Sequence, residues 1–350
     1  MSYRWLPRLT CRARLAVLLV LSLTVTPVAL APAEPRDAPW HLGQGFRNLD
    51  ASYNYTMGGR AWSLLRRAVT SAPPRGTPPA RVANDGAELR GNGTHPTVTW
   101  IGHATLLVQL QGVNILTDPN WADHAGPSIL GVRRLVAPGL RFQDLPRIHA
   151  VVISHDHYDH LDLPTVRRLA REHQPTFFVP LGVGAWLAER GIKNVVELDW
   201  WQSRTFRGLT FTATPAQHGS GRGLLDQNER LWSSWVIAGG GKRLFFGGDT
   251  GYTKALAEIG RRLGPFDVAA LPIGGYSAFT ARHPNHINPE EAMQLFDDLR
   301  GRVLVPVHWG TFALNREPFR EPPDRLLAEA LRRGEEESVA LLSQGQSISW

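Results

Sequence analysis

Short apolar runs separated by turn residues dominate the chain from Thr97 onward, and they predict a domain built largely from buried strands. The runs are rich in Val, Ile, Leu and Phe, and Gly, Pro, Asp or Asn stands between them. The predicted strands are residues 98–101, 105–110, 113–117, 150–153, 176–179, 195–198, 209–213, 234–238, 243–246, 268–271 and 303–307.

Turn and helix signals in the sequence indicate how these strands are connected. Gln111 and Gly112 join two strands of an opening meander, and the three glycines at 239–241 predict a hairpin. Residues 164–172 predict a helix with Asp162 as its cap, and residues 289–299 predict another helix between the last two strands. Segments 325–332 and 339–342 close the domain. The mixture of strands and helices places the domain in the α/β (α+β) class.

The stretch that follows the apolar run 150–153 carries the candidate chemistry. Residues 154–162 read SHDHYDHLD, so three imidazoles and a carboxylate fall within six positions. Neutral imidazole and carboxylate are common ligands of divalent cations. In the loop after a buried strand, His155 and His157 can turn to one ion while Asp159 and His160 turn to another. A chance cluster of exposed histidines is the weaker interpretation of this spacing.

The register H-x-H-x-D-H resembles that of the metallo-β-lactamase superfamily, which carries it at the mouth of a four-layer αββα sandwich. The resemblance implies this fold and three more donors, each within a few residues after a predicted strand: His218, Asp249 and His308. It assigns His155, His157 and His218 to a first ion, Asp159, His160 and His308 to a second, and Asp249 as the bridge. Seven such donors suit two Zn²⁺, with iron or manganese as the alternatives.

Two more polar residues lie near the predicted strand ends. Asp118 follows the third strand, where a carboxylate behind a ligand imidazole can fix the orientation of the ring. For His103, in the segment WIGHAT, two interpretations stay open: a residue of the site or a structural hydrogen-bond donor.

Several further motifs are similar to the N-acylphosphatidylethanolamine-hydrolysing phospholipase D family, a group of binuclear zinc phosphodiesterases that act on a membrane lipid. The similarity covers roughly residues 97–345 and implies release of phosphatidic acid and an N-acylethanolamine, with Asp159 or Asp249 orienting the attacking water. The motifs are 100–105 (WIGHAT), 116–119 (LTDP), 197–201 (ELDWW), 231–235 (LWSSW), 248–252 (GDTGY), 264–267 (GPFD) and 308–314 (HWGTFAL).

The same resemblance points to the substrate side of the site. His286, before the segment NPEEA, matches a histidine near the family's substrate pocket. Tyr276 matches the family, but residues 277–283 (SAFTARH) depart from the acidic residue and Pro-Arg that follow the tyrosine there. Because this segment should border the site, the departure affects the expected head-group or acyl preference and leaves the metal chemistry unchanged.

The amino-terminal residues 1–33 predict an export signal rather than a part of the fold. Four arginines precede the uncharged stretch 15–31, and small residues at 29–33 offer cleavage sites. A retained membrane anchor is the alternative, since seventeen uncharged residues can reach across a thin bilayer. The positive flank predicts that the catalytic domain lies outside the cytoplasm, in the periplasm or another extracytoplasmic space. This holds whether the segment is cleaved or retained as an anchor.

Residues 34–95 form a Pro/Gly-rich arm before the hydrolase domain, which we place at 96–350. The arm has one helical candidate, residues 60–69, in which Trp and Leu alternate with Arg. We expect this helix to pack on the main domain, and contact with a membrane surface is the alternative.

Composition narrows the possible chemistry. Removing Arg4, Arg8, Arg12 and Arg14 lowers the formal charge from +7 to +3, so the basic balance does not indicate nucleic-acid binding. The single cysteine, Cys11, lies before the apolar stretch, so metal ions have to be held by His and Asp. The oligomeric state cannot be read from the sequence.

Other functions compete with phospholipid cleavage. A lactonase or other acyl hydrolase can use the same ligand set, because the same water can attack a carbonyl. A true β-lactamase or a nuclease fits less well, since the former often uses a cysteine or lacks His160 and the latter needs a basic face. A non-catalytic binding module could lose metal ligands, yet all seven are present.

Overall fold

The computed structural model describes residues 38–50, 75–127, 131–276, 285–312, 314 and 317–350. All of them belong to one unit of the chain, Ala38–Trp350. The predicted export segment 1–33, the helix predicted at 60–69 and the departing segment 277–283 lie outside the described residues.

Seven strands form the first sheet, in the order β15-β1-β2-β3-β6-β7-β8. The predicted meander β1-β2-β3 is antiparallel, and β3, β6, β7 and β8 are parallel. Gln111 and Gly112 both have positive φ, as a tight two-residue hairpin requires. The strands are β1 (Thr97–Gly102), β2 (Thr105–Leu110), β3 (Val113–Thr117), β6 (Ala150–Val152), β7 (Thr176–Pro180), β8 (Val195–Leu198) and β15 (Ser347–Ser349).

Six strands form the second sheet, in the order β14-β13-β12-β11-β10-β9. Strands β9 to β12 are antiparallel, and β12, β13 and β14 are parallel. The glycine hairpin is confirmed, because Gly240 and Gly241 turn the chain with positive φ between β11 and β12. The strands are β9 (Ser203–Phe206), β10 (Leu209–Thr214), β11 (Ser234–Gly239), β12 (Lys242–Phe246), β13 (Phe266–Pro272) and β14 (Gly301–Val307).

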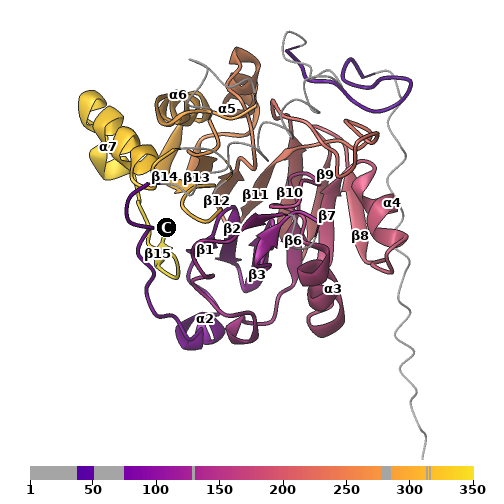
Figure 1. Ribbon diagram of the computed structural model, residues 1–350, viewed down its shortest axis with the longest axis horizontal. Helices are drawn as coiled ribbons and strands as arrows, with labels where there is room; N and C mark the ends of the chain where they lie inside the picture. Colours follow the sequence, from indigo (N-terminus) through magenta and orange to yellow (C-terminus); the bar gives the residue numbers. More distant parts are fainter. Residues whose placement is uncertain (1–37, 51–74, 128–130, 277–284, 313, 315–316) are drawn as a thin grey trace, which may run out of the picture. The chain divides into compact units, whose positions relative to one another are not determined.

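The sheets pack face to face between two layers of helices, which confirms the predicted four-layer sandwich (Figure 1). Successive side chains of one strand point to opposite faces of the sheet and pack in different cores. Leu106 and Val108 of β2 join the core shared with the second sheet, while Leu107 between them packs under α3 (Leu163–Glu172). Both faces of the inner strands are therefore covered, which explains their uninterrupted apolar sequences.

The helices begin where the sequence supplies caps. Asp162 accepts a hydrogen bond from the Thr165 amide (3.0 Å) at the start of α3. Asn288 and Glu291 form a capping box on α6. No helix in the described part of the chain is long and apolar enough to span a membrane. The remaining elements are α2 (Ala87–Gly91), α3 (Leu163–Glu172), α4 (Val183–Ala188), α5 (Ala257–Leu263), α6 (Pro289–Leu299), α7 (Glu321–Arg333), η3 (Phe142–Asp144), η4 (Lys254–Leu256), η5 (Glu336–Ser338), β4 (His124–Ala125) and β5 (Val132–Arg133).

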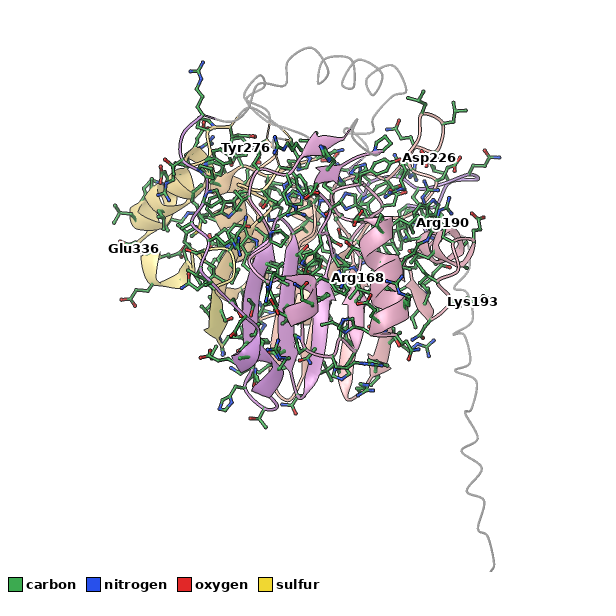
Figure 2. The ribbon with its side chains drawn as sticks, turned by 60° about the horizontal axis from the view of Figure 1, so that its bottom comes forward. Arg168, Arg190, Lys193, Asp226, Tyr276 and Glu336 are labelled. Atoms are coloured by element: carbon green, nitrogen blue, oxygen red, sulfur yellow. The ribbon has the colours of Figure 1, made fainter. Side chains whose placement is uncertain are left out.

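One edge of the sandwich collects the polar residues singled out in the sequence. Strands β1, β3 and β6 run in one direction, as do β10, β12, β13 and β14 in the other sheet. Their carboxyl ends meet, because residues that follow them are in contact: His160 after β6 touches Asp118 after β3 and Asp249 after β12. Figure 2 shows Tyr276, after β13, at this end of the strands.

Candidate metal centre

Asp249 lies at the centre of the polar cluster. Its Oδ2 atom is 3.2 Å from His160 Nε2, 3.6 Å from His218 Nε2 and 4.0 Å from His155 Nε2. Its Oδ1 atom is 3.2 Å from His308 Nε2. Gly248 allows this close approach, since a Cβ there would lie 2.5 Å from the Cβ of Ser154. One buried carboxylate therefore faces imidazoles from both sheets.

Three imidazoles converge on one side of Asp249. His155 Nε2 lies 2.8 Å from His157 Nδ1, and His218 Nε2 lies 3.2 Å from the same atom. A neutral imidazole carries one proton and one lone pair, so three ring nitrogens that meet at a point cannot all be satisfied by one another. A cation between them would accept all three lone pairs.

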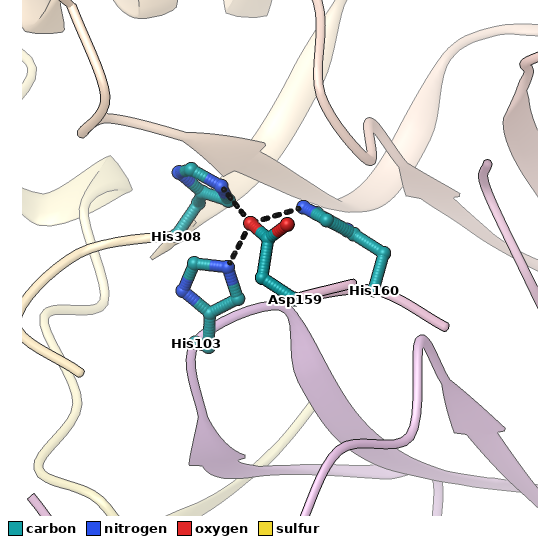
Figure 3. A group of neighbouring side chains, drawn as sticks. All are labelled: His103, Asp159, His160 and His308. Atoms are coloured by element: carbon teal, nitrogen blue, oxygen red, sulfur yellow. Dashed lines mark hydrogen bonds and ion pairs between the residues drawn. The ribbon is translucent and has the colours of Figure 1, made fainter. Parts of the chain in front are cut away.

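A second group converges on the Asp159 carboxylate (Figure 3). Its Oδ2 atom is 3.0 Å from His103 Nε2, 3.3 Å from His160 Nε2 and 3.4 Å from His308 Nε2. His160 and His308 are also the two closest imidazoles to Asp249. The two groups therefore share Asp249 and lie side by side.

The outer nitrogen of each of four rings has its own partner. His160 Nδ1 donates to Asp118 (2.7 Å), His218 Nδ1 to the Asn285 carbonyl (2.9 Å) and His308 Nδ1 to the Gly274 carbonyl (3.3 Å). His155 Nδ1 lies 2.9 Å from Ser154 Oγ. These contacts fix the rings and turn each Nε2 atom toward the cluster, as supporting partners do in metal sites.

The electrostatics divide the cluster into two halves. Burial, together with the neighbouring imidazoles, holds the pKa of His155 and His157 well below its usual value, so both rings are neutral. In the other half burial also disfavours a charged ring, but Asp249 and Asp159 outweigh it and raise the pKa of His308 to about 9. The nearby imidazoles likewise outweigh burial for Asp249 and hold its pKa well below the usual range.

The residues present fit a divalent cation. His160 Nε2, His308 Nε2 and Asp249 Oδ1 are buried and form no hydrogen bond within the described part of the chain. Buried polar atoms are normally hydrogen-bonded, and these three point into a space surrounded by nitrogen and oxygen donors. A cation that binds here would displace the protons from the Nε2 atoms of His160 and His308.

The remaining candidate residues divide between the cluster and its surroundings. His103 is buried and contacts Asp159, and burial lowers its pKa to about 3. Asp118 supports the ring of His160, and His286 Nδ1 lies 3.7 Å from Asp249 Oδ2. Tyr276 is different: its hydroxyl donates to Glu321 of α7 (3.3 Å), and no contact with the cluster is seen among the described residues.

Two supporting contacts were not predicted from the sequence. Asn48 is buried and holds the backbone of His218 from both sides: its Nδ2 donates to the His218 carbonyl (2.8 Å), and its Oδ1 accepts from the His218 amide (3.0 Å). Asp156, inside the histidine motif, accepts from Arg230 Nε (2.5 Å). The acid in the motif was visible in the sequence, but its distant partner was not.

A pocket opens beside the second half of the cluster. His103 and His308 form one wall, and the rest is mainly apolar, with Trp309, Phe312 and Phe319 among the lining side chains. An apolar group of a substrate could lie there while a polar group reaches the imidazoles.

Comparisons with known proteins agree with the fold. A model described as "Beta-lactamase superfamily domain" matches residues 113–309. An uncharacterized protein of Mycobacterium tuberculosis is 42% identical, over 94% of this chain and 91% of its own length. N-acyl-phosphatidylethanolamine-hydrolyzing phospholipase D 1 of Caenorhabditis elegans is 43% identical, over 65% of this chain and 68% of its own. A metallo hydrolase from Ignicoccus hospitalis has a similar fold, with a TM-score of 0.57 at 24% identity, covering 73% of this chain and 99% of that chain.

Proposed function

This chain belongs to the β-lactamase superfamily of metal-dependent hydrolases, and we propose that it is a binuclear zinc phosphodiesterase. Its proposed substrates are N-acylphosphatidylethanolamine-like phospholipids, and its products are phosphatidic acid and an N-acylethanolamine. The observation that carries the proposal is the convergence of imidazoles from both sheets on one buried carboxylate, Asp249.

We assign the donors in two sets that share this carboxylate. His155, His157 and His218 would hold the first ion, because their ring nitrogens already face one another. Asp159, His160 and His308 would hold the second. Asp249 contacts members of both sets and would bridge the ions. An all-nitrogen-and-oxygen donor set suits zinc, and it also accepts iron or manganese.

Two divalent ions bound there would lower the pKa of a shared water and neutralise charge on the phosphoryl oxygens. Asp159 and Asp249 would orient this water by accepting its hydrogen bonds, and His103 would hold the carboxylate of Asp159 in place (3.0 Å). The water's oxygen would form a new bond to phosphorus as the bond between phosphorus and the ethanolamine oxygen breaks. A proton of the attacking water would pass to that oxygen, which leaves as the hydroxyl of N-acylethanolamine.

The lipid class rests on one comparison. The relative from C. elegans is named for the hydrolysis of N-acyl-phosphatidylethanolamine. The departure at residues 277–283 concerns the head-group or acyl preference within this class.

A substrate panel tests this proposal. Metal-reconstituted protein is incubated with vesicles containing N-acylphosphatidylethanolamine and, separately, with lactones, and the products are identified by mass spectrometry. We expect metal-dependent formation of phosphatidic acid and N-acylethanolamine. Efficient lactone opening without phospholipid cleavage would replace the proposal with the acyl-hydrolase alternative.

His103→Gln is expected to lower turnover by roughly 10–100-fold and to leave the metal content nearly unchanged, because His103 acts through Asp159. His149→Gln provides a matched control, since His149 accepts a hydrogen bond from the Asn114 amide (3.0 Å) at the other end of the strands. Steady-state kinetics and elemental analysis of both variants check the prediction. Loss of a full metal equivalent in His103→Gln would instead make His103 a ligand.

Asn48→Ala is expected to weaken metal retention by roughly tenfold, because the backbone of His218 loses both of its hydrogen bonds to Asn48. The matched control is Asn194→Ala, which removes a hydrogen bond to the Pro175 carbonyl (2.9 Å) far from the cluster. Both variants should lose about 1–2 kcal/mol of stability. Metal release to a chelator, followed over time, should be faster in Asn48→Ala than in the unmodified protein, and unchanged in Asn194→Ala. Equal release rates from the two variants would contradict the proposed support of the metal site by Asn48.

We also propose that the chain works outside the cytoplasm, exported by residues 1–33 or anchored through them. The charge and apolar pattern of this segment support the proposal. Fractionation of cells that express the full chain, with amino-terminal sequencing of the recovered protein, tests it. Recovery of uncleaved protein in the cytoplasm would contradict it.

A further inference from the structure

Two leucines at the tip of one turn are the most exposed large apolar side chains of the described residues. Leu224 is 70% and Leu225 is 83% exposed, and Gly223 beside them is exposed as well. Burial of such a side chain is favourable, so an adjacent pair facing water is unusual. The described structure provides no packing partner that accounts for them.

The turn is rigid. Asp226 accepts hydrogen bonds from the amides of Gly223 (2.7 Å) and Arg222 (3.1 Å), and it also pairs with Arg230. Figure 2 shows Asp226 at the same end of the strands as Tyr276. A turn fixed in this way presents its leucines without a further entropic cost of ordering the backbone.

The base of the turn is joined to the loop that carries the histidine motif. Arg222 Nη1 donates to the carbonyls of Asp156 (2.7 Å) and Leu161 (2.8 Å). The Gly221 amide donates to Asp156 Oδ1 (2.6 Å). The leucine tip is therefore held at a fixed position next to the metal cluster.

Half-buried aromatic and basic side chains surround the base of the turn. The guanidinium of Arg222 lies 3.9 Å from the ring centre of Tyr158 and 4.9 Å from that of Trp186. Arg190 covers Trp186 at 3.8 Å and pairs with Glu189 (3.1 Å). Aromatic rings with arginines behind a projecting apolar tip are typical of the water–membrane interface.

A third exposed leucine lies on a neighbouring segment. The Phe46 amide donates to the Asn228 carbonyl (2.8 Å), which places the turn that contains Leu42 beside the loop that contains Leu224 and Leu225. Leu42 is 47% exposed. Convex tips of this size bury too little surface for a stable protein partner, but they can enter a lipid layer.

We propose that the turn at residues 222–226 inserts Leu224 and Leu225 into the interfacial layer of a phospholipid bilayer and thereby docks the metal centre against a lipid surface. The choice of a bilayer as the partner rests on the proposed function. The position of the tip beside the histidine loop then serves to bring the cluster to lipid head groups.

The test uses a single fluorescent label on the full chain. Cys11 is the only cysteine, so Cys11→Ser with Leu225→Cys gives one labelling site for an environment-sensitive nitrobenzoxadiazole dye. The matched control carries Leu331→Cys, on α7, where the native leucine is 65% exposed. The vesicles are mixtures of ether-linked phosphatidylcholine and phosphatidylglycerol without N-acylated lipid, so no turnover is involved.

On addition of vesicles, the dye at position 225 should shift its emission to shorter wavelength and brighten several-fold, while the dye at 331 should not change. Replacing both leucines, as Leu224→Ser with Leu225→Ser, should lower vesicle partitioning by about tenfold or more, and Leu331→Ser should leave it unchanged. A dye at 225 that stays in water while the chain is on the vesicle would overturn the proposal, as would the absence of vesicle binding. Insertion in this experiment, combined with no cleavage of N-acylphosphatidylethanolamine in the separate substrate panel, would leave the docking surface intact and refute the phosphodiesterase.

Discussion

Asp249→Asn is expected to reduce turnover by about a thousandfold or more and to lower the metal content. Among the residues that the structure describes, Asp249 is the one carboxylate within 4.0 Å of imidazoles on both sides of the cluster. Asparagine keeps the shape of the aspartate side chain but supplies no negative charge to the two cations. Loss of this charge is expected to cost several kcal/mol of transition-state stabilisation, which corresponds to the stated loss of turnover. His157→Ala, which removes one of the three converging nitrogens, should have a similar effect. Steady-state kinetics with elemental analysis measure both quantities.

The matched control is Asp267→Asn on the neighbouring strand β13. Asp267 pairs with Arg302 (3.0 Å) and accepts a hydrogen bond from the Arg243 amide (2.9 Å), far from the cluster. This variant should keep its metal and its turnover, because an exposed ion pair contributes little. Near-normal turnover by Asp249→Asn would refute the assignment of the bridge.

Purified protein is expected to contain close to two equivalents of zinc or a similar metal, and its removal should abolish turnover. Buried imidazoles and carboxylates face one another within a few ångströms, and His160 Nε2 and His308 Nε2 form no hydrogen bond with the residues that the structure describes. Because ions that bind only the folded state stabilise it, chelation should also lower the melting temperature by several degrees. Elemental analysis, calorimetry and restoration of activity with added zinc check these effects. An active preparation with only trace metal would contradict the account.

Much of the sandwich follows from local sequence. Strand β2 is a short, mostly apolar run that ends before the turn residues Gln111 and Gly112, and the apolar end of β12 is followed by Gly247. The helix α3 begins at the cap expected from Asp162. The elements that were not predicted have weak local signals. Strand β9 lies at a sheet edge and alternates exposed residues, and β15 has three residues that gain their structure by pairing with β1. Helix α4 has six residues after Gly182.

The cluster was predictable for a different reason. Each of its donors follows a strand whose end is marked in the sequence, and the carboxyl ends of like-directed strands meet at one edge. The partners that hold the donors could not be found in this way. Asn48 stands 170 residues from His218, and nothing local in either segment indicates the contact. Tyr276 carried a family match but turns its hydroxyl to Glu321.

Cleavage in ¹⁸O-labelled water tests the central claim most directly. Metal-reconstituted protein is given N-acylphosphatidylethanolamine in labelled water, and the products are analysed by mass spectrometry. Attack of water on phosphorus at the cluster around Asp249 predicts one ¹⁸O atom in phosphatidic acid and none in N-acylethanolamine. Label in a released fatty acid, with no phosphatidic acid formed, would show acyl hydrolysis and contradict the account.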